Sequence, residues 1–201
     1  MLDGLLPVME HFYTIQGEGY NTGKAAYFIR LGGCDVGCVW CDVKESWDAA
    51  SHPKLSIGHL VAETMKHGAK NVVVTGGEPL LHRLNELCEA FRQQNISVWL
   101  ETSGSSSLSG KFDWICVSPK KFKAALPEVV QAADELKVVV FNKSDLEWAE
   151  NQAQNCAPNC KLYLQPEWSK QTTMTPLIIE YVKQNPKWQI SLQTHKYLQI
   201  P

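Results

Sequence analysis

The apolar positions of the chain alternate between short β-branched runs and longer stretches with helical spacing. The clearest helical stripe lies within residues 80–91, where Leu81, Leu84, Cys88 and Phe91 share one face. Short apolar runs between turn residues indicate buried strands. Strands are predicted at residues 25–31, 71–75, 97–102, 113–118, 135–141, 161–165 and 188–193, and helices at residues 57–65, 80–91, 127–133, 145–153 and 175–185.

This order of elements favours a parallel sheet with right-handed crossovers. The chain has 201 residues, fewer than the roughly 250 of a complete eight-fold β/α barrel. We therefore predict an α/β fold, a partial and incomplete barrel with a mostly parallel open sheet. No internal repeat or linker divides the sequence, so residues 1–201 are expected to form a single domain.

Four polar motifs each follow a predicted strand. In sheets of this type, chemistry gathers at the carboxyl ends of the strands. We therefore expect the four motifs to meet in one site. They are GGCDVGCVWCD at 32–42, TGGEP at 75–79, ETSGS at 101–105 and SPKK at 118–121.

Composition narrows the class of protein. A net charge of −2 with scattered basic residues gives no extended nucleic-acid footprint, and no apolar run approaches the ~18 residues of a membrane span. The start, MLDGLLPVMEHFY, lacks the basic region of a secretory signal. With seven cysteines and no export signal, a cytoplasmic protein is predicted, with metal or catalytic roles for thiols ahead of disulfides.

The densest chemical signal is the spacing Cys-x3-Cys-x2-Cys formed by Cys34, Cys38 and Cys41. A zinc site would need a fourth ligand, such as His52 or Cys88. A 4Fe–4S cluster held by three thiolates would instead leave one iron free for another ligand. The spacing favours the cluster and leaves zinc open.

With Trp40 before the third cysteine, this loop resembles the cluster motif of radical S-adenosylmethionine (SAM) enzymes. The resemblance implies a 4Fe–4S cluster and SAM, whose amino and carboxylate groups chelate the open iron. An electron from the cluster then breaks the C5′–S bond of SAM and yields a 5′-deoxyadenosyl radical. The protein would supply position and exclude water.

The other strand-end motifs also resemble parts of the SAM site in that superfamily. Glycines in GGEP allow a ligand to approach the backbone closely, although a strand-to-helix turn explains the same motif. Hydroxyl and ammonium groups of ETSG and SPKK suit the ribose and carboxylate of SAM. By resemblance, the SAM-binding residues are Trp40, Cys41, Asp42, Gly77, Ser103, Ser118, Pro119 and Lys120.

Three further segments look like the 7-carboxy-7-deazaguanine synthase family: YTIQGEG at 13–19, FIRLGGC at 28–34 and LQTHKYLQIP at 192–201. The resemblance implies a carbon–nitrogen lyase that converts 6-carboxy-5,6,7,8-tetrahydropterin to 7-carboxy-7-deazaguanine with loss of ammonia. That product belongs to the deazapurine route to preQ0 and queuosine. A flavodoxin- or ferredoxin-type reductant and a homodimer are the corresponding expectations.

The pterin substrate suits particular residues. Arg30 offers a guanidinium for its carboxylate, and Gln16 and Glu18 offer partners for its polar ring edge. The α-carboxylate of Pro201 is expected to accept from ring N–H groups. The substrate residues implied are Ile15, Gln16, Gly17, Glu18, Arg30, Thr75, His195 and Pro201.

One position departs from the family pattern. A threonine or serine usually follows Cys-Asp and supplies an oxygen to a Mg²⁺ site, whereas this chain has Val43. Mg²⁺ wants hard oxygen ligands, so only Asp42 remains as a protein ligand, and weaker Mg²⁺ dependence is expected. The other four cysteines, Cys88, Cys116, Cys156 and Cys160, are interpreted as structural.

Two other functions remain open from the sequence. A glycyl-radical-enzyme activase shares the cysteine loop and GGEP, but must receive a partner's polypeptide. A zinc-stabilised, non-enzymatic module would share only the cysteines. Broad absorption near 400 nm in anaerobically purified protein would separate a cluster protein from a zinc protein.

Overall fold

The computed structural model describes residues 4–201. Residues 1–3 of the expected domain lie outside this range. The strands are β1 (Leu5–Ile15), β2 (Ala25–Leu31), β3 (Lys54–Ser56), β4 (Asn71–Gly76), β5 (Ser97–Thr102), β6 (Trp114–Val117), β7 (Glu135–Val140), β8 (Lys161–Pro166) and β9 (Trp188–Ile190). The helices are α1 (Ile57–Lys66), α2 (Asn85–Gln93), α3 (Pro127–Gln131), α4 (Ser144–Ala153), α5 (Gln171–Gln184) and α6 (Thr194–Leu198).

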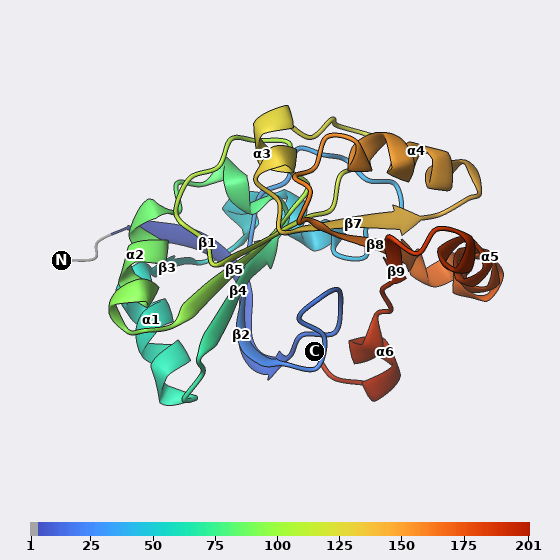
Figure 1. The fold of residues 1–201 in the computed structure, drawn as a ribbon. Helices are drawn as coiled ribbons and strands as arrows, with labels where there is room; N and C mark the ends of the chain where they lie inside the picture. The colour runs from blue at the N-terminus through green and yellow to red at the C-terminus, as the bar shows by residue number, and fades with distance from the viewer. Residues whose placement is uncertain (1–3) are drawn as a thin grey trace.

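Within residues 4–201 the strands form one sheet in the order β3-β1-β2-β4-β5-β6-β7-β8-β9. β1 pairs antiparallel with β2 and β3. From β2 to β9 every pairing is parallel and follows chain order, so each crossover steps in the same direction along the sheet (Figure 1). The predicted mostly parallel open sheet is confirmed.

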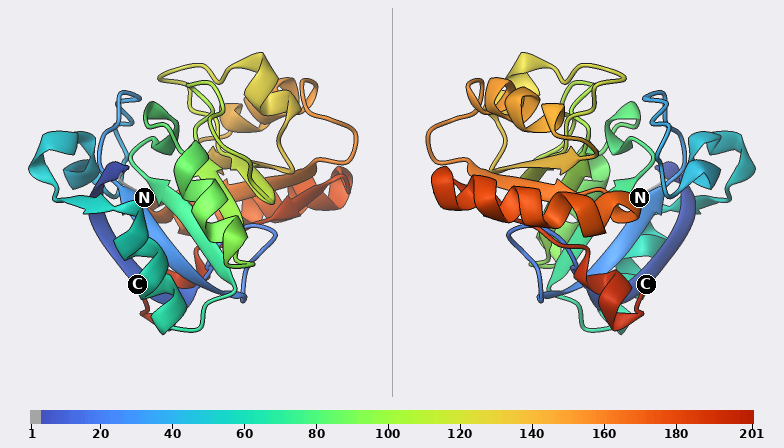
Figure 2. Two further views of the ribbon diagram at one scale, coloured as in Figure 1. Left: turned by 90° about the vertical axis from the view of Figure 1, so that its left-hand side faces the viewer. Right: turned by 90° about the vertical axis from the view of Figure 1, so that its right-hand side faces the viewer.

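Side chains of the central strands alternate between two environments, as the period of two requires. Leu100 on β5 and Leu136 on β7 point to the helices and are fully buried. Their neighbours Glu101 and Lys137 point to the opposite face and line a cavity. Figure 2 shows from two sides that α1, α2, α4 and α5 lie on the outside of the strands, whereas α6 lies apart from them. One face of the sheet therefore carries most of the core, and the other combines a small apolar cluster of Ala26, Val73 and Trp99 with the side chains that line the cavity.

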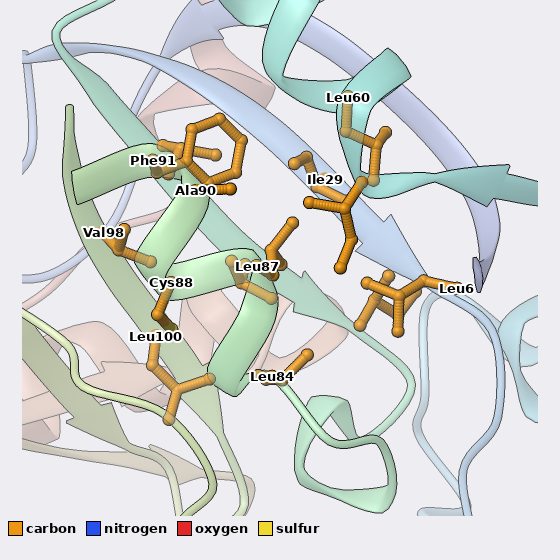
Figure 3. Close-up of a cluster of buried hydrophobic side chains, with 14 of the residues drawn as sticks. Leu6, Ile29, Leu60, Leu84, Leu87, Cys88, Ala90, Phe91, Val98 and Leu100 are labelled. Atoms are coloured by element: carbon orange, nitrogen blue, oxygen red, sulfur yellow. The ribbon is translucent and has the colours of Figure 1, made fainter. Parts of the chain in front are cut away.

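The larger part of the core lies between α1, α2 and the first parallel strands. Leu87 and Phe91 of α2 are fully buried and meet Ile29 of β2 and Leu60 of α1 in one cluster (Figure 3). A second cluster packs α4 and α5 against β7 and β8 around Trp188. Burial of each such side chain stabilises a fold by about 1.5–3 kcal/mol. The two clusters therefore hold the strands that carry the site in fixed positions.

Helix α1 begins and ends where the sequence indicates. The Ser56 hydroxyl caps the first turn by accepting from the His59 backbone N–H. Gly68 follows the last turn with φ of +68°, a conformation that glycine adopts without strain. Across residues 4–201, no helix is long and apolar enough to cross a membrane.

The structure differs from the predicted elements in a few places. The helix expected at 80–91 begins only at Asn85, because residues 79–81 form a separate 3-10 turn and leave Leu81 exposed. α5 begins at Gln171, four residues before the predicted start. Strands β1 and β3 and helix α6 were not predicted.

Candidate active site

Two adjoining cavities open at the carboxyl ends of the parallel strands. The first has a volume of about 320 Å³ and the second about 160 Å³. They share the lining residues Glu18, Arg30, Asp42, Val43, Thr75, Glu101 and Gln193. The predicted convergence of the strand-end motifs is therefore correct, since all four motifs contribute to the first cavity.

Cys34, Cys38 and Cys41 all line the first cavity as free thiols. The loop is held at its base by backbone bonds from the Gly33 N–H to the Ser46 carbonyl (2.6 Å) and from the Cys34 N–H to the Trp47 carbonyl (3.1 Å). Burial raises the pKa of Cys34 and Cys38. A metal bound there must therefore displace protons from these thiols.

The donor set suits a cluster. The three thiols line one cavity and can each bind one iron of a 4Fe–4S cluster, which leaves the fourth iron free for another ligand. Within residues 4–201, no three His, Cys, Asp or Glu side chains converge as ligands of a single metal ion. A lone zinc ion would require thiolates about 3.8 Å apart around one point.

The GGEP loop packs directly on the cysteine loop. The Gly77 N–H donates to the Leu31 carbonyl at 2.9 Å, and the Glu78 N–H donates to the Gly33 carbonyl at 2.8 Å. A Cβ on Gly77 would lie 2.2 Å from the Gly33 oxygen, so only glycine permits this approach. Gly77 also lines the first cavity, which leaves its backbone open to a ligand.

The Glu78 carboxylate is fully buried and joins the GGEP loop to the ETSG loop. It accepts from the Thr102 hydroxyl at 2.5 Å, from the Ser103 N–H at 2.8 Å and from the Ser103 hydroxyl. A further bond from the Leu80 N–H at 3.0 Å fixes the start of the following turn. Glu78 therefore has a structural role that the sequence analysis did not assign.

The SPKK segment forms the next wall of the first cavity. Lys120 is bent back, and its ammonium donates to the Ser118 hydroxyl and carbonyl at 2.6 Å. It also lies 5.7 Å from the Trp40 ring centroid. Burial lowers the pKa of Lys120. Of the predicted SAM residues, Trp40, Cys41, Asp42, Gly77, Ser103, Ser118 and Lys120 line this cavity, whereas Pro119 lines neither.

All eight residues predicted for the substrate line the second cavity: Ile15, Gln16, Gly17, Glu18, Arg30, Thr75, His195 and Pro201. They come from the end of β1 and the turn after it, from β2 and β4, and from the C-terminal segment. Four segments far apart in sequence thus meet at one point. The structure thus brings these eight residues together in one cavity, and their contact with the substrate stays a prediction.

Arg30 lines both cavities. Its direct cross-strand partner in the β1–β2 register is Glu10, and the Arg30 Nε lies 2.6 Å from a Glu10 oxygen. A guanidinium has five N–H donors, so this ion pair uses only one edge of it. The pair fixes the side chain and leaves terminal N–H groups for an anion.

A buried cation between the cavities was missed by the sequence analysis. Lys137 is 4% exposed, and its ammonium lies 2.6 Å from Glu18 and 3.0 Å from Glu101. Each carboxylate also accepts from an amide: Glu18 from Gln193 at 2.9 Å and Glu101 from Gln16 at 3.2 Å. The five side chains form one charged network at the junction of the cavities.

The network fixes its own protonation states. Burial alone would raise the pKa of Glu18, but the Lys137 ammonium and hydrogen bonds lower it to about 2. Burial alone would lower the pKa of Lys137, yet nearby Cys116, Glu101 and Glu18 hold it well above its usual value. The available signal was a lysine inside the apolar run ELKVVV, where a charge needs a partner.

Another buried carboxylate, that of Glu135, lies at the start of β7. Glu135 accepts from the Tyr20 N–H at 3.1 Å and from the Trp114 indole at 3.0 Å. Its other oxygen, Oε1, has no hydrogen-bond partner among residues 4–201. Burial and the nearby Glu101 raise the pKa of Glu135 to about 7, so part of the population is a neutral acid near physiological pH.

The C-terminal segment closes one side of the second cavity. The Thr194 N–H and hydroxyl both donate to the Gly17 carbonyl at 2.9 Å. His195 packs on Gly17, where a Cβ would lie 2.3 Å from its Nδ1. Burial lowers the pKa of His195, which favours the neutral ring. The segment YTIQGEG is therefore joined to the tail by direct contacts.

An open, mostly parallel α/β sheet with a three-cysteine loop at its carboxyl edge defines the class of protein. A family model described as "Radical SAM superfamily" matches residues 28–140. In line with this, the chain is similar to the crystal structure of QueE from Escherichia coli, with a TM-score of 0.84, 32% identity, and coverage of 94% of this chain and 93% of that one. A 4Fe–4S cluster and SAM are the cofactors of this class.

Relatives at higher identity identify the family within that class. A 7-carboxy-7-deazaguanine synthase of Flavobacterium psychrophilum is 55% identical over 98% of this chain and 93% of its own length. Synthases of Synechocystis (44%) and Escherichia coli K12 (33%) match over 96% of the chain and 93% and 98% of their own lengths. The chain belongs to the 7-carboxy-7-deazaguanine synthase family. The zinc-module and activase alternatives are thereby set aside.

Proposed function

We propose that the protein is a radical SAM carbon–nitrogen lyase. It contracts the ring of 6-carboxy-5,6,7,8-tetrahydropterin to 7-carboxy-7-deazaguanine with loss of ammonia, on the deazapurine route to preQ0 and queuosine. The observation that carries the proposal is the pair of adjoining cavities. One holds the three cysteines and the other is lined by every residue implied for the pterin.

In the first cavity, Cys34, Cys38 and Cys41 would hold the cluster, which when bound would supply the electron for cleavage of SAM. The open backbone at Gly77 accepts the close approach of the methionine end of SAM. Trp40, with the Lys120 ammonium 5.7 Å from its ring centroid, covers another side of the cavity. These side chains position SAM and keep water out.

In the second cavity, the residues bind and orient the pterin. Arg30 pairs with the substrate carboxylate through the N–H groups that Glu10 leaves free. The carboxylates of Glu18 and Glu101, both paired with the Lys137 ammonium, accept from N–H groups of the ring edge. Gln16 and the neutral His195 complete the wall. Together these contacts bring the reacting ring to the junction with the first cavity.

An anaerobic assay tests the proposal directly. The reconstituted protein is supplied with SAM, dithionite and 6-carboxytetrahydropterin, and products are followed by chromatography and mass spectrometry. We expect 7-carboxy-7-deazaguanine and ammonia in equal amounts, without net consumption of SAM. Cys41→Ala, which removes one cluster thiolate, serves as the inactive control. Failure of the wild-type protein to form the deazaguanine would reject the function.

The same proposal includes partners and compartment. A flavodoxin or ferredoxin is the proposed electron donor. Supporting this, Val39 on the cysteine loop is 69% exposed, and Phe122 is 43% exposed with its ring 6.0 Å from that of Trp40, so apolar surface lies beside the cluster site. We also propose a homodimer and a cytoplasmic location. Light scattering of the purified protein tests the oligomeric state.

A further inference from the structure

Of the carboxylates at the junction of the cavities, Glu18 and Glu101 are already paired with the Lys137 ammonium, which leaves Asp42 as the candidate magnesium ligand. Val43 lines both cavities in the place where the family pattern has a hydroxyl residue, and its side chain offers no oxygen. Mg²⁺ needs hard oxygen ligands in near-octahedral geometry. Asp42, the adjacent carboxylate, has its Oδ2 3.3 Å from the Lys196 ammonium. A cation already faces the one carboxylate that the pattern retains.

The ammonium of Lys196 is well placed to take the position of a metal ion beside Asp42. Lys196 lies on α6 (Figure 1) and lines the first cavity, and its side chain is 22% exposed. Its ammonium is 5.0 Å from the ring centroid of Trp168, another lining residue. A surface ion pair alone is worth little. Here the aromatic ring and the carboxylate hold the ammonium from two sides.

The backbone around Lys196 is anchored on both sides. Before it, Thr194 is bonded to the Gly17 carbonyl, and the Gln193 amide donates to Glu18 at 2.9 Å. After it, the Tyr197 hydroxyl donates to Gln171 at 2.6 Å. The short helix α6 is thereby tied to the substrate wall and to the start of α5. These anchors fix the backbone that carries Lys196, and its contacts with Asp42 and Trp168 orient the side chain.

We propose that Lys196 replaces the divalent cation: its ammonium, oriented by Asp42, binds the carboxylate of the pterin together with Arg30. The inference rests on the function proposed above. Arg30, Asp42 and Val43 line both cavities, so the Asp42–Lys196 pair lies where a pterin in the second cavity faces the first. The substrate carboxylate would then meet a guanidinium and an ammonium, and no metal ion.

Equilibrium binding of unreactive probes tests this assignment. Cluster-loaded protein with SAM bound is titrated anaerobically with 6-carboxypterin and with pterin, which lacks the carboxylate, and the pterin fluorescence is followed. Lys196→Gln should weaken 6-carboxypterin binding about tenfold or more, as for loss of a charge-assisted contact. Pterin binding should change less than about twofold. Lys196→Arg should retain most of the affinity.

The matched control is Lys183→Gln, which removes an exposed lysine of α5 that is paired only with Glu180. It should leave both affinities unchanged. Equal losses for 6-carboxypterin and pterin in Lys196→Gln would mean that Lys196 only anchors the tail, and would overturn the proposal. A selective loss of SAM affinity would assign Lys196 to the methionine carboxylate instead, and would also overturn it.

The response to metal gives an independent readout. Wild-type 6-carboxypterin affinity and turnover should be the same in EDTA and in millimolar Mg²⁺, whereas Val43→Thr with Lys196→Gln should gain affinity when Mg²⁺ is added. A wild-type protein that requires Mg²⁺ for 6-carboxypterin binding would refute the replacement. Should wild-type protein make no deazaguanine, the proposed function fails; should it make product while Lys196→Gln binds normally, only this inference fails.

Discussion

Removal of the Lys137 ammonium is the sharpest test of the charged network. Lys137→Met keeps the length of the side chain but leaves Glu18 and Glu101 facing each other without a cation. Their side chains are only 18% and 20% exposed, so water screens them poorly. We expect a large loss of stability at pH 7, because two partly buried carboxylates lose their shared partner.

Two independent routes give the magnitude. The pKa of Glu18 is lowered from 4.5 to about 2, and a shift of that size corresponds to about 3 kcal/mol. Breaking a buried ion pair by removing one partner costs about 3–5 kcal/mol. Both point to a loss of about 3–5 kcal/mol in the free energy of unfolding.

The assay is urea unfolding of the cluster-free protein, followed by tryptophan fluorescence. A chain of this size buries about 70% of its unfolded surface and needs no cluster to fold. Since the folded-state pKa of Glu18 is depressed, its stabilising contribution is present above pH 4.5 and is lost as the pH falls toward 2. The difference between wild type and Lys137→Met should therefore shrink below pH 4.5.

A matched double variant separates charge from packing. Adding Glu18→Gln to Lys137→Met removes one unpaired carboxylate and should recover part of the stability at pH 7. A loss below about 1 kcal/mol, as for an exposed ion pair, would refute the reasoning. So would a loss that stayed constant from pH 7 to pH 3.

Three further predictions concern single sites. The pKa of Glu135 is raised to about 7, so the folded protein binds one more proton than the unfolded chain between pH 4.5 and 7. The free energy of unfolding of the wild type should therefore fall by about 3 kcal/mol as the pH rises from 4.5 to 7. Glu135→Gln should remove this slope in pH-dependent urea unfolding, and an unchanged slope would contradict the prediction. Arg30→Ala should leave the cluster and SAM binding intact, judged by absorbance and calorimetry, but weaken substrate binding by at least about tenfold; loss of the cluster would instead make Arg30 structural. Gly77→Ala would force a Cβ to within 2.2 Å of the Gly33 oxygen and should weaken SAM binding about tenfold, whereas Gly58→Ala, which meets nothing within 4 Å, should bind SAM normally.

Much of the sheet was predictable because its central strands are buried on the helix side. Short apolar runs such as NVVVT and SVWLET clearly predict buried strands. β1 was harder, since only its first part is buried and Pro7 and Glu10 break the apolar pattern. Its identity as a strand depends on pairing with β2 and β3. The helix predicted at 80–91 starts later, at Asn85, because residues 79–81 form a separate turn whose Leu80 N–H donates to the Glu78 carboxylate.

The site divides in the same way. The cysteine loop and GGEP were recognisable because, within each motif, the residues lie only a few positions apart in the sequence. Lys137 was not, because its partners Glu18 and Glu101 are distant in sequence. The contact of Lys196 with Asp42 likewise depends on how the tail returns to the sheet. Ion pairs between residues far apart in the sequence are the feature of the site that local sequence patterns could not predict.

The four bonds to the Glu78 carboxylate have a consequence for how the molecule tolerates change. Residues 76–80 and residues 102–103 are held together by the single carboxylate of Glu78, so an insertion in either segment would break the hydrogen bonds that join it to the other. We therefore expect insertions to be tolerated only in connections that lie outside these two segments.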